Sequence, residues 1–362
     1  MKILQFSYTL EPGGAERFVV DLSNELAKNN EVKLYVLRDE KIGNLGFYVP
    51  EISEKVTYIN LKINKGFKPQ LIWAFYKILR TEQPDIVHCH LNLVNYFFLL
   101  SFLFYGRIRF VYTIHSDAKA EVTSKIERLI RRFFFKHSLF LAVAISDETK
   151  KSFESYYKLK KAKLIINGRK FSGKTVLYEK VLNEVSELKP EPDSLTFCHV
   201  AAFCEAKNQK MLISVFNKLR YEGFNVILLI IGDGFEKATD LKALALDHIH
   251  FLGLKSNVND YLYASDAFCL SSVWEGMPIS LIEAFACECI PVCTPVGGIV
   301  NTIEHGVTGF LSQSVSEKDY LEIIKQFIKL RKSIKKELLS SFFLENLSIE
   351  QCATNYMKLY SE

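Results

Sequence analysis

Two glutamates eight residues apart are the most chemically informative pair in this sequence. Glu275 lies in a turn-rich stretch, and Glu283 lies about one helical turn inside the predicted helix 279–287. Apolar strands are predicted on either side, over 266–270 and 290–293. Two carboxylates at this spacing can contact different parts of one elongated ligand. They can equally be a helix-capping residue and an ordinary helix residue, so the spacing alone does not establish a site.

The order strand, turn, helix, strand predicts a β-turn-α-β unit. Such a unit directs the unpaired N–H groups of its helix toward the crevice beyond the carboxyl ends of the strands. Here those groups are the backbone amides near Ile279 and Ser280. A phosphate is the kind of ligand that binds at such a position.

The residues around the two glutamates resemble a known family. EGMP is followed after four residues by EA, and then come PV, VGG and HGVTGFL. This pattern resembles the nucleotide-sugar pocket of glycosyltransferase family 4, which comprises retaining enzymes of the GT-B fold, among them a bacterial surface-polysaccharide type. The resemblance implies that Glu275 contacts hydroxyl groups of the transferred sugar and that Glu283 contacts the ribose. It also implies that the amides near Ile279 and Ser280 face the diphosphate.

A second part of the resemblance lies near the N-terminus. Gly13 and Gly14 stand between a predicted strand, 3–6, and a predicted helix, 15–28. Glycines at such a turn let a ligand approach the backbone closely, although alone they indicate only a tight turn. The family carries GGAE-like turns at this place, facing the donor diphosphate across the cleft. The resemblance gives Gly13 and Gly14 that role.

The sequence HVAAFCEAKNQ resembles the family pattern VGR, four residues, KN. Lys207 matches the lysine that grips donor phosphates, although a lone lysine is more often an ordinary surface residue. Ala201 and Ala202 stand where glycine and arginine are usual, which removes a bidentate phosphate clamp. Gly232 lies in the strand-to-turn element 230–234, which we expect to line the same crevice.

Histidines end two predicted strands of the N-terminal half. His115 follows the strand 110–114, at a position where α/β domains bind ligands. The family resemblance implies a contact of His115 with the reacting sugar or acceptor; otherwise it is a histidine at the edge of the core. His88 and His90 share one face of the strand 85–90. No third ligand has matching spacing, so we expect hydrogen-bonded histidines and no metal.

One segment suggests contact with a membrane. Residues 125–140 interleave cationic and aromatic residues at helical spacing. If the cations share an exposed face, they can rest on anionic lipid; otherwise the segment is an amphipathic helix with a solvated basic face. The cations concerned are Arg128, Arg131, Arg132 and Lys136. The apolar run 96–105 is about half the roughly 20 residues that a bilayer needs, so it predicts a helix packed on a sheet.

Length and strand–helix alternation predict two doubly wound α/β domains for these 362 residues. We expect an N-terminal, acceptor-side Rossmann-like domain over 1–170, completed by a crossover helix over 348–362. A linker over 171–193 and a nucleotide-sugar-binding Rossmann-like domain over 194–347 complete the chain. The resemblance implies a GT-B fold in which the two domains face a central cleft.

Composition excludes some classes of protein. A hydrophobic content of 49% excludes a disordered chain, and a net charge of +5 is too mild to indicate nucleic-acid binding. The eight cysteines show no C-x2-C pair and predict buried, reduced thiols. The N-terminus shows no signal-peptide pattern, which predicts a cytoplasmic protein, with the inner face of the cytoplasmic membrane as a further location.

The resemblance implies a retaining glycosyltransferase that moves a hexose-type sugar from a UDP- or GDP-linked donor. The acceptor would be a glycan or a polyprenyl-linked glycan in capsule, exopolysaccharide or lipopolysaccharide synthesis. His115, Glu275 and Lys207 would act at the reaction centre, without a cofactor or metal. Two alternatives remain: a GT-B nucleotide-sugar epimerase, whose acid and base carboxylates we do not find, and a non-catalytic sugar-binding homologue, which the missing arginine would suit.

Overall fold

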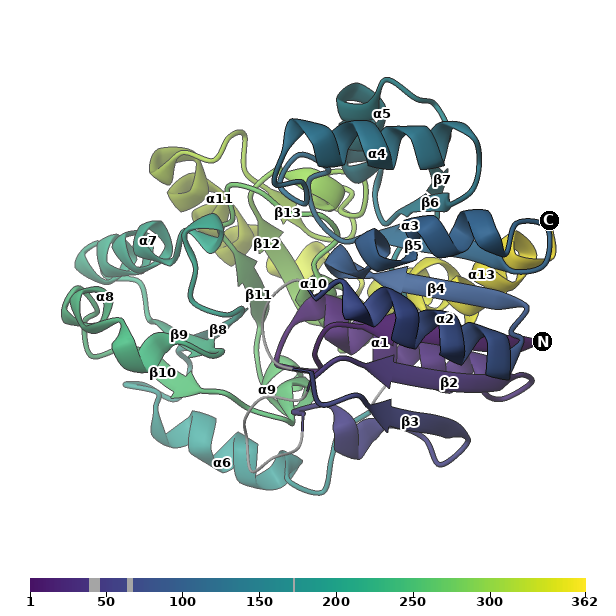
Figure 1. Cartoon of the computed structure of the whole chain (residues 1–362). Helices are drawn as coiled ribbons and strands as arrows, with labels where there is room; N and C mark the ends of the chain where they lie inside the picture. The colour runs from purple at the N-terminus through teal and green to yellow at the C-terminus, as the bar shows by residue number, and fades with distance from the viewer. Residues whose placement is uncertain (39–45, 64–67, 172) are drawn as a thin grey trace. The chain divides into compact units, whose positions relative to one another are not determined.

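The protein consists of two compact units. A computed structural model describes residues 1–38, 46–63, 68–171 and 173–362. The first unit comprises Met1–Lys170 and Ile349–Glu362, and the second comprises Phe171–Ser348. Both chain termini therefore belong to the first unit (Figure 1).

Among the described residues of the first unit, seven strands form one parallel sheet in the order β3-β2-β1-β4-β5-β6-β7. Most of these strands are apolar and buried, as is typical of parallel strands covered by helices on both faces. The strands are β1 (Lys2–Ser7), β2 (Glu31–Val36), β3 (Val56–Asn60), β4 (Ile86–His90), β5 (Arg109–Ile114), β6 (Leu141–Ala144) and β7 (Lys163–Leu164).

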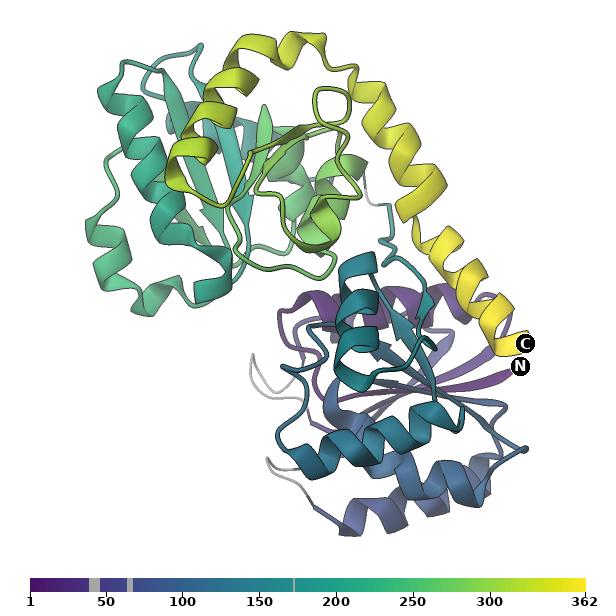
Figure 2. The same ribbon diagram turned by 90° about the horizontal axis from the view of Figure 1, so that it is seen from above.

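Helices cover both faces of this sheet. Helices α2, α3 and α4 lie side by side on one face, and α1 and α13 pack together on the other (Figures 1 and 2). The helices are α1 (Gly14–Leu26), α2 (Gln70–Glu82), α3 (Val94–Leu103), α4 (Lys125–Lys136), α5 (Asp147–Tyr157) and α13 (Ile349–Ser361). The short helices η1 (Val49–Glu51) and η2 (Leu91–Leu93) complete the unit.

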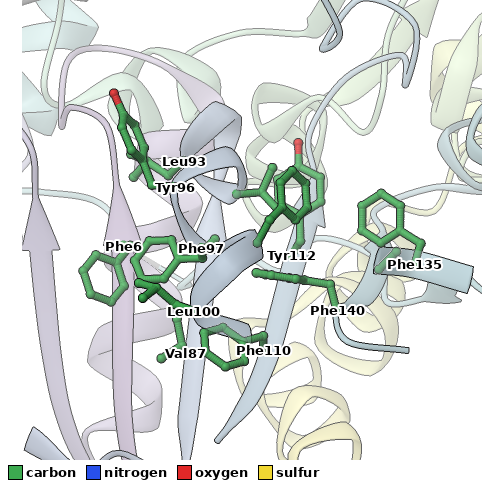
Figure 3. Packing of buried hydrophobic residues seen from close by; sticks show 14 of the residues in the cluster. Phe6, Val87, Leu93, Tyr96, Phe97, Leu100, Phe110, Tyr112, Phe135 and Phe140 are labelled. Carbon is green, nitrogen blue, oxygen red and sulfur yellow. The ribbon is translucent and has the colours of Figure 1, made fainter. Parts of the chain in front are cut away.

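Aromatic side chains fill the core between the sheet and α2–α4 (Figure 3). The Phe97 ring stacks on Phe75 at 4.7 Å and lies 4.7 Å from Phe6. A fully buried phenylalanine contributes about 1.5–3 kcal/mol to folding. The apolar run 96–105 lies mostly in α3 and packs on the sheet, as predicted. Within the described ranges, no helix combines the length and apolar character that crossing a bilayer requires.

The second unit repeats this architecture. Its described strands form a six-stranded parallel sheet in the order β10-β9-β8-β11-β12-β13. They are β8 (Leu195–Val200), β9 (Val226–Ile231), β10 (Ile249–Gly253), β11 (Ala267–Leu270), β12 (Ile290–Cys293) and β13 (Phe310–Leu311). The prediction of two Rossmann-like α/β domains is confirmed.

The helices of the second unit are α6 (Tyr178–Glu187), α7 (Gln209–Tyr221), α8 (Thr239–Ala243), α9 (Val258–Tyr263), α10 (Ile279–Ala286), α11 (Glu317–Leu330) and α12 (Lys336–Phe342). Short helices are η3 (Glu205–Lys207), η4 (Phe235–Lys237), η5 (Gly297–Ile299), η6 (Arg331–Ser333) and η7 (Phe343–Leu347). Residues 171–193, which we expected as a linker, contain α6, and α6 packs on α9 of this unit. The last helix of the chain, α13, follows η7 and belongs to the first unit.

Candidate functional site

Each sheet has one point where the strand order reverses. In the first unit β1 pairs with both β2 and β4, and in the second β8 pairs with both β9 and β11. Loops that leave adjacent strands at such a point diverge and create a ligand crevice. Most of the candidate residues follow these strands or their immediate neighbours, so the topology alone places them at two crevices, one in each unit.

In the second unit the structure joins two predicted site residues directly. Lys207 ends η3 after β8, and Glu275 lies in the turn after β11. The Lys207 ammonium donates to the Glu275 carboxylate at 2.6 Å, and the Ser272 hydroxyl donates to the same oxygen at 2.5 Å. Glu275 is buried, whereas the Lys207 side chain keeps 22% of its surface exposed. The arrangement therefore presents a cation and a fixed hydrogen-bond acceptor side by side.

The main chain ties the loops of Lys207 and Glu275 together. The amide of Val273 donates to the Ala206 carbonyl at 2.8 Å, and the Ser271 hydroxyl donates to the Lys207 carbonyl at 2.9 Å. Because these bonds hold the backbone on both sides, the ion pair is positioned before any ligand arrives. Preorganised charge of this kind needs little rearrangement when a ligand binds.

Two glycines hold the Glu275 turn from its other side. Gly297 has a φ of +56°, and a Cβ atom there would overlap the Glu275 carbonyl oxygen. The amide of Gly298 donates to the Gly276 carbonyl at 2.7 Å. Only glycine combines this backbone conformation with this close approach. We had used VGG only as part of the family pattern, so its role in fixing the Glu275 turn is a finding of the structure.

The predicted helix after Glu275 is α10, which begins at Ile279. Its N-cap is Pro278, whose side chain makes no capping hydrogen bond. Helix geometry leaves the first amides, those of Ile279 and Ser280, without an acceptor inside the helix. Glu283 lies one turn along and is half-buried. The amides and Glu283 thus follow the Glu275 turn at the end of β11.

Gly232 directly follows β9, beside the loop in which the family's usual arginine is missing. A Cβ atom at Gly232 would overlap the Ala201 carbonyl oxygen, and the Gly232 amide donates to the Gly253 carbonyl at 3.0 Å. Gly232 therefore allows the ends of β8, β9 and β10 to lie close together. The Ala202 side chain is exposed, and Lys207 is the sole cation of the loop 201–208.

In the first unit, His115 is bonded to another predicted strand-end histidine. Its Nε2 lies 3.1 Å from His90 Nδ1, and His90 Nε2 lies 2.8 Å from the Gln5 side-chain oxygen. Burial lowers the pKa of His115 to about 3 and holds the pKa of His90 well below its usual value. Both imidazoles are therefore neutral near pH 7, and each can donate one hydrogen bond and accept another.

His88 faces the last helix of the chain. Its Nδ1 lies 2.7 Å from the Tyr360 hydroxyl, and its Nε2 lies 2.7 Å from the Thr113 hydroxyl. Thr113 also bonds to Tyr356, so this network fastens α13 to β4 and β5. No group of three or more His, Cys, Asp or Glu side chains in the described part of the chain is arranged to hold a metal ion.

The predicted glycine turn begins α1. Gly13 is the N-cap and Gly14 is the first helical residue. The Glu16 carboxylate occupies the space that a Gly13 side chain would need, and it accepts a hydrogen bond from Thr9 at 3.4 Å. Burial raises the pKa of Glu16 above its usual value. We had not predicted a role for Glu16.

Family models match most of the chain. Residues 12–168 match the model described as "Glycosyltransferase Family 4", and residues 182–338 match the one described as "Glycosyl transferases group 1". The chain belongs to the GT-B glycosyltransferases of the family 4 type. The resemblance on which we based the sequence predictions is thereby confirmed.

Relatives agree with this assignment. The chain is 28% identical over 67% of its length to the uncharacterized glycosyltransferase MJ1059 of Methanocaldococcus jannaschii, and the match spans 66% of that protein, slightly under two thirds. It is 26% identical over 91% of its length to an N-acetylgalactosamine-N,N'-diacetylbacillosaminyl-diphospho-undecaprenol 4-alpha-N-acetylgalactosaminyltransferase of Campylobacter jejuni, of which the match covers 92%. The crystal structure of Anabaena HepE with UDP-glucose shares the fold, with a TM-score of 0.81, 17% identity and coverage of 100% and 99% of the two chains.

The four cations of the segment 125–140 do not share an exposed face, which was the condition for their expected contact with anionic lipid. Arg131 is fully buried, whereas Arg128 donates to the Tyr156 carbonyl at 2.6 Å and Arg132 donates to the Tyr157 carbonyl at 2.7 Å. Tyr156 and Tyr157 end α5, where helix geometry leaves carbonyl groups unpaired. The guanidinium groups turn inward because they satisfy these carbonyls. Of the four, only Lys136 is exposed.

Buried Arg131 also supports the loop that carries His115. Its guanidinium donates to the Glu127 carboxylate at 2.7 Å and to the Glu121 carbonyl at 3.1 Å. The Glu121 carboxylate in turn accepts from the amides of His115 and Ser116, both at 3.2 Å. A basic residue within an amphipathic pattern gave no sign in the sequence that it would be buried.

A hollow of about 500 Å³ opens in the first unit between the starts of α3 and α4. Its lining includes Tyr8, Asn95, Glu127, Ile126 and Ile130. The side-chain oxygen of Asn95 is buried without a hydrogen-bond partner in the described residues. A polar group of a ligand would supply that partner.

Proposed function

We propose that the protein is a retaining glycosyltransferase that moves a hexose-type sugar from a UDP- or GDP-linked donor to a lipid-linked glycan. Membership of the family 4 type and the acceptor named for the Campylobacter relative support this class of reaction. The product would belong to capsule, exopolysaccharide or lipopolysaccharide synthesis, at the inner face of the cytoplasmic membrane. The reaction would need no cofactor and no metal.

The observation that carries the proposal is the preformed contact among Lys207, Glu275 and Ser272. In the proposed reaction the Lys207 ammonium turns to the donor diphosphate and stabilises the negative charge that develops as the nucleotide leaves. Glu275 then accepts hydrogen bonds from sugar hydroxyls. Because Lys207 and Ser272 already bind the Glu275 carboxylate, we assign it to holding the sugar and not to attacking it.

The remaining candidates take supporting roles in this proposal. The amides of Ile279 and Ser280 bind the diphosphate, and Glu283 binds the ribose. Gly232 keeps the ends of β8, β9 and β10 close together beside the donor, and the Gly13–Gly14 turn presents its main chain to the diphosphate. His115, held neutral by burial, contacts the reacting sugar or the acceptor as a hydrogen-bonding group.

The proposal is tested by incubating the full chain with a panel of UDP- and GDP-sugars and a polyprenyl diphosphate-linked glycan in detergent. We expect transfer from one donor, and NMR of the product should show the donor's anomeric configuration retained. Inversion at the anomeric carbon would exclude the retaining mechanism. Release of free nucleotide and an epimerised sugar would establish the epimerase alternative. Binding of a donor without turnover would instead establish a non-catalytic homologue, which the exposed Ala202 would suit.

Two variants separate the roles of the glutamates. Glu283→Ala should weaken binding of the free nucleotide roughly 10- to 150-fold, the equivalent of a lost charge-assisted hydrogen bond. Glu275→Gln should leave that affinity nearly unchanged while reducing turnover. Calorimetry and initial rates measure the two effects, and the exposed Glu322→Gln on α11 is the control. Equal losses in both variants would contradict the separate roles.

A further inference from the structure

Helix α4 faces solvent with its apolar side. Ile126 is 72% exposed, Leu129 is 65% exposed and Phe133 is 51% exposed, whereas Arg131 on the opposite side is fully buried. An ordinary surface helix places its residues the other way round. The inward hydrogen bonds of Arg128, Arg131 and Arg132 therefore leave the apolar side chains of α4 outside.

The neighbouring helices extend this apolar surface. On α3, Phe102 is 65% exposed, and on α2, Trp73 is 61% exposed. Stacking of Phe98 on Phe134 at 4.6 Å joins α3 to α4. We call the exposed apolar residues of these three helices the α2–α4 face; they are Trp73, Leu99, Phe102, Leu103, Ile126, Leu129, Ile130 and Phe133. Clustered exposed apolar residues of this kind mark interaction surfaces.

The exposed charges on these helices have one sign. On α2, α3 and α4, every residue of which the structure describes, the exposed charged side chains are Lys77, Arg80, Lys125 and Lys136. Both acids of the three helices are only half-buried, but both are paired: Glu82 bonds to Lys33, and Glu127 bonds to Arg131. The α2–α4 face therefore combines apolar side chains with cations and presents no exposed carboxylate of its own helices.

We propose that the α2–α4 face docks on an anionic membrane surface. The apolar side chains enter the interface, Trp73 lies at headgroup level, and the four cations contact lipid phosphates. A second copy of this chain is a poor occupant, because the four cations of each copy would meet and repel. The face shares Ile126 and Ile130 with the hollow beside Asn95, so a lipid-linked acceptor, which this step takes from the proposed function, would reach the hollow from the membrane.

The test is co-sedimentation of the full chain with vesicles of phosphatidylcholine mixed with phosphatidylglycerol. The double variant Leu129→Glu/Phe133→Glu should reduce partitioning roughly tenfold or more for each side chain, because each loses its burial in lipid. The matched control is Tyr221→Glu/Leu338→Glu, which changes exposed apolar residues of the second unit and should bind as the wild type does. Circular dichroism melting and nucleotide binding should be the same in all three proteins.

The cations give a second measurement. Replacing Lys77, Arg80, Lys125 and Lys136 by Gln should weaken binding to the anionic vesicles about fivefold for each residue at low salt. Binding to phosphatidylcholine alone should change little. A loss that is equal on both kinds of vesicle would contradict the charge contribution.

Three results would overturn the proposal. The first is that the wild type does not sediment with the vesicles. The second is that Leu129→Glu/Phe133→Glu sediments with them as well as the wild type does. The third is that sedimentation velocity without lipid shows a dimer of the wild type that these substitutions dissociate. The proposed function fails separately, since vesicle binding without any sugar transfer contradicts only the enzymatic role. Transfer to a water-soluble acceptor should survive the docking substitutions.

Discussion

The two units share a parallel α/β scaffold but fix their strand-end residues by different means. In the second unit, main-chain hydrogen bonds and the close approach of Gly297 hold the turn that carries Glu275. In the first unit, side chains do this work, through the His115–His90–Gln5 chain and the contact of His88 with Tyr360. A site that is formed mainly by the main chain suits a ligand rich in phosphate, because phosphate groups bind main-chain amides and cations.

The surfaces of the two units differ as well. Many exposed apolar residues of the second unit lie in loops, such as Phe203, Val273 and Val307, whereas most of those of the first unit lie on α2, α3 and α4. The buried face of α4 also supports the His115 loop through Arg131 and Glu121. The loop that carries His115 in the first unit therefore depends on buried charged side chains, whereas the turn that carries Glu275 in the second unit depends on glycines. This difference predicts which substitutions damage which unit.

Arg131→Met should have the largest effect on stability. It removes the cation that compensates the Glu127 carboxylate, and breaking a buried pair costs about 3–5 kcal/mol. Although burial alone would raise it, hydrogen bonds from Thr123 and Asn95 and the charge of Arg131 hold the pKa of Glu127 at about 2. Peptide-resolved hydrogen exchange should show that the amides of β4 and β5 lose protection, whereas those of β8 and β9 do not.

The control for Arg131 is Lys125→Met on the same helix, which is exposed and should change stability by less than about 0.5 kcal/mol. A loss from Arg131→Met that spreads equally over both units would contradict the assignment of this network to the first unit alone. A loss no larger than that of the control would show that the buried guanidinium contributes no net stability.

Lys207→Met should reduce turnover roughly 100- to 1000-fold, the usual effect of removing one group that stabilises developing charge. The free energy of unfolding of the second unit should change by much less than the activation free energy that this rate loss represents, because Ser272 still donates to Glu275. Initial transfer rates measure the effect. The matched control is Lys210→Met, an exposed lysine of α7, which should keep wild-type rates. Equal rate losses in the two variants would remove Lys207 from the site.

Gly297→Ala tests whether the second unit depends on its backbone. A methyl group would overlap the Glu275 carbonyl at a φ of +56°, and such overpacking costs about 1–3 kcal/mol. Hydrogen exchange should increase in the turn after β11, and Glu275-dependent turnover should fall with it. Gly173→Ala is the control, since nothing lies near its missing side chain and its backbone is not left-handed. If the two substitutions behave alike, the turn does not rely on Gly297.

Sequence patterns were sufficient for the parts that depend on periodicity. Apolar strands and turn residues predicted β11, α10 and β12 closely, and the crossing helix α13 was expected from the family. The strands and helices follow from local patterns and from the parallel topology that those patterns impose. The family resemblance, not spacing, placed Lys207 and Glu275 in one donor pocket, and the structure joins the two although they are far apart in the chain.

The sequence did not reveal which face of α4 is buried. Cations and apolar residues alternate there at helical spacing, so either face could point inward until the unpaired carbonyls of α5 are placed beside Arg128 and Arg132. The roles of Glu121 and Glu16 were missed for the same reason, because a long-range partner decides whether a carboxylate is buried. Gly297 was visible only as a motif, since its close contact is with a turn about twenty residues earlier.

The smallest expected effect concerns the pH dependence of the first unit. His88 is fully buried, and burial holds its pKa well below its usual value of about 6.5. Below about pH 6.5 the unfolded chain takes up a proton at His88 that the folded chain does not, so stability falls as pH falls, by about 1.4 kcal/mol per pH unit. His88→Gln removes this term. The free energy of unfolding of His88→Gln should be lower at every pH, because the bonds to Tyr360 and Thr113 are altered. Its decrease in stability between about pH 6 and pH 5 should nevertheless be smaller than that of the wild type by about 1.4 kcal/mol.

Urea unfolding monitored by hydrogen exchange in β4 and β5 measures the change of stability with pH. The raised pKa values of Glu121 and Glu16 cancel in the comparison because both proteins contain these residues. The exposed His137→Gln should keep the wild-type slope. Parallel curves for His88→Gln and the wild type would mean that His88 takes up its proton in the folded protein too, and that the first unit does not depend on a neutral histidine network.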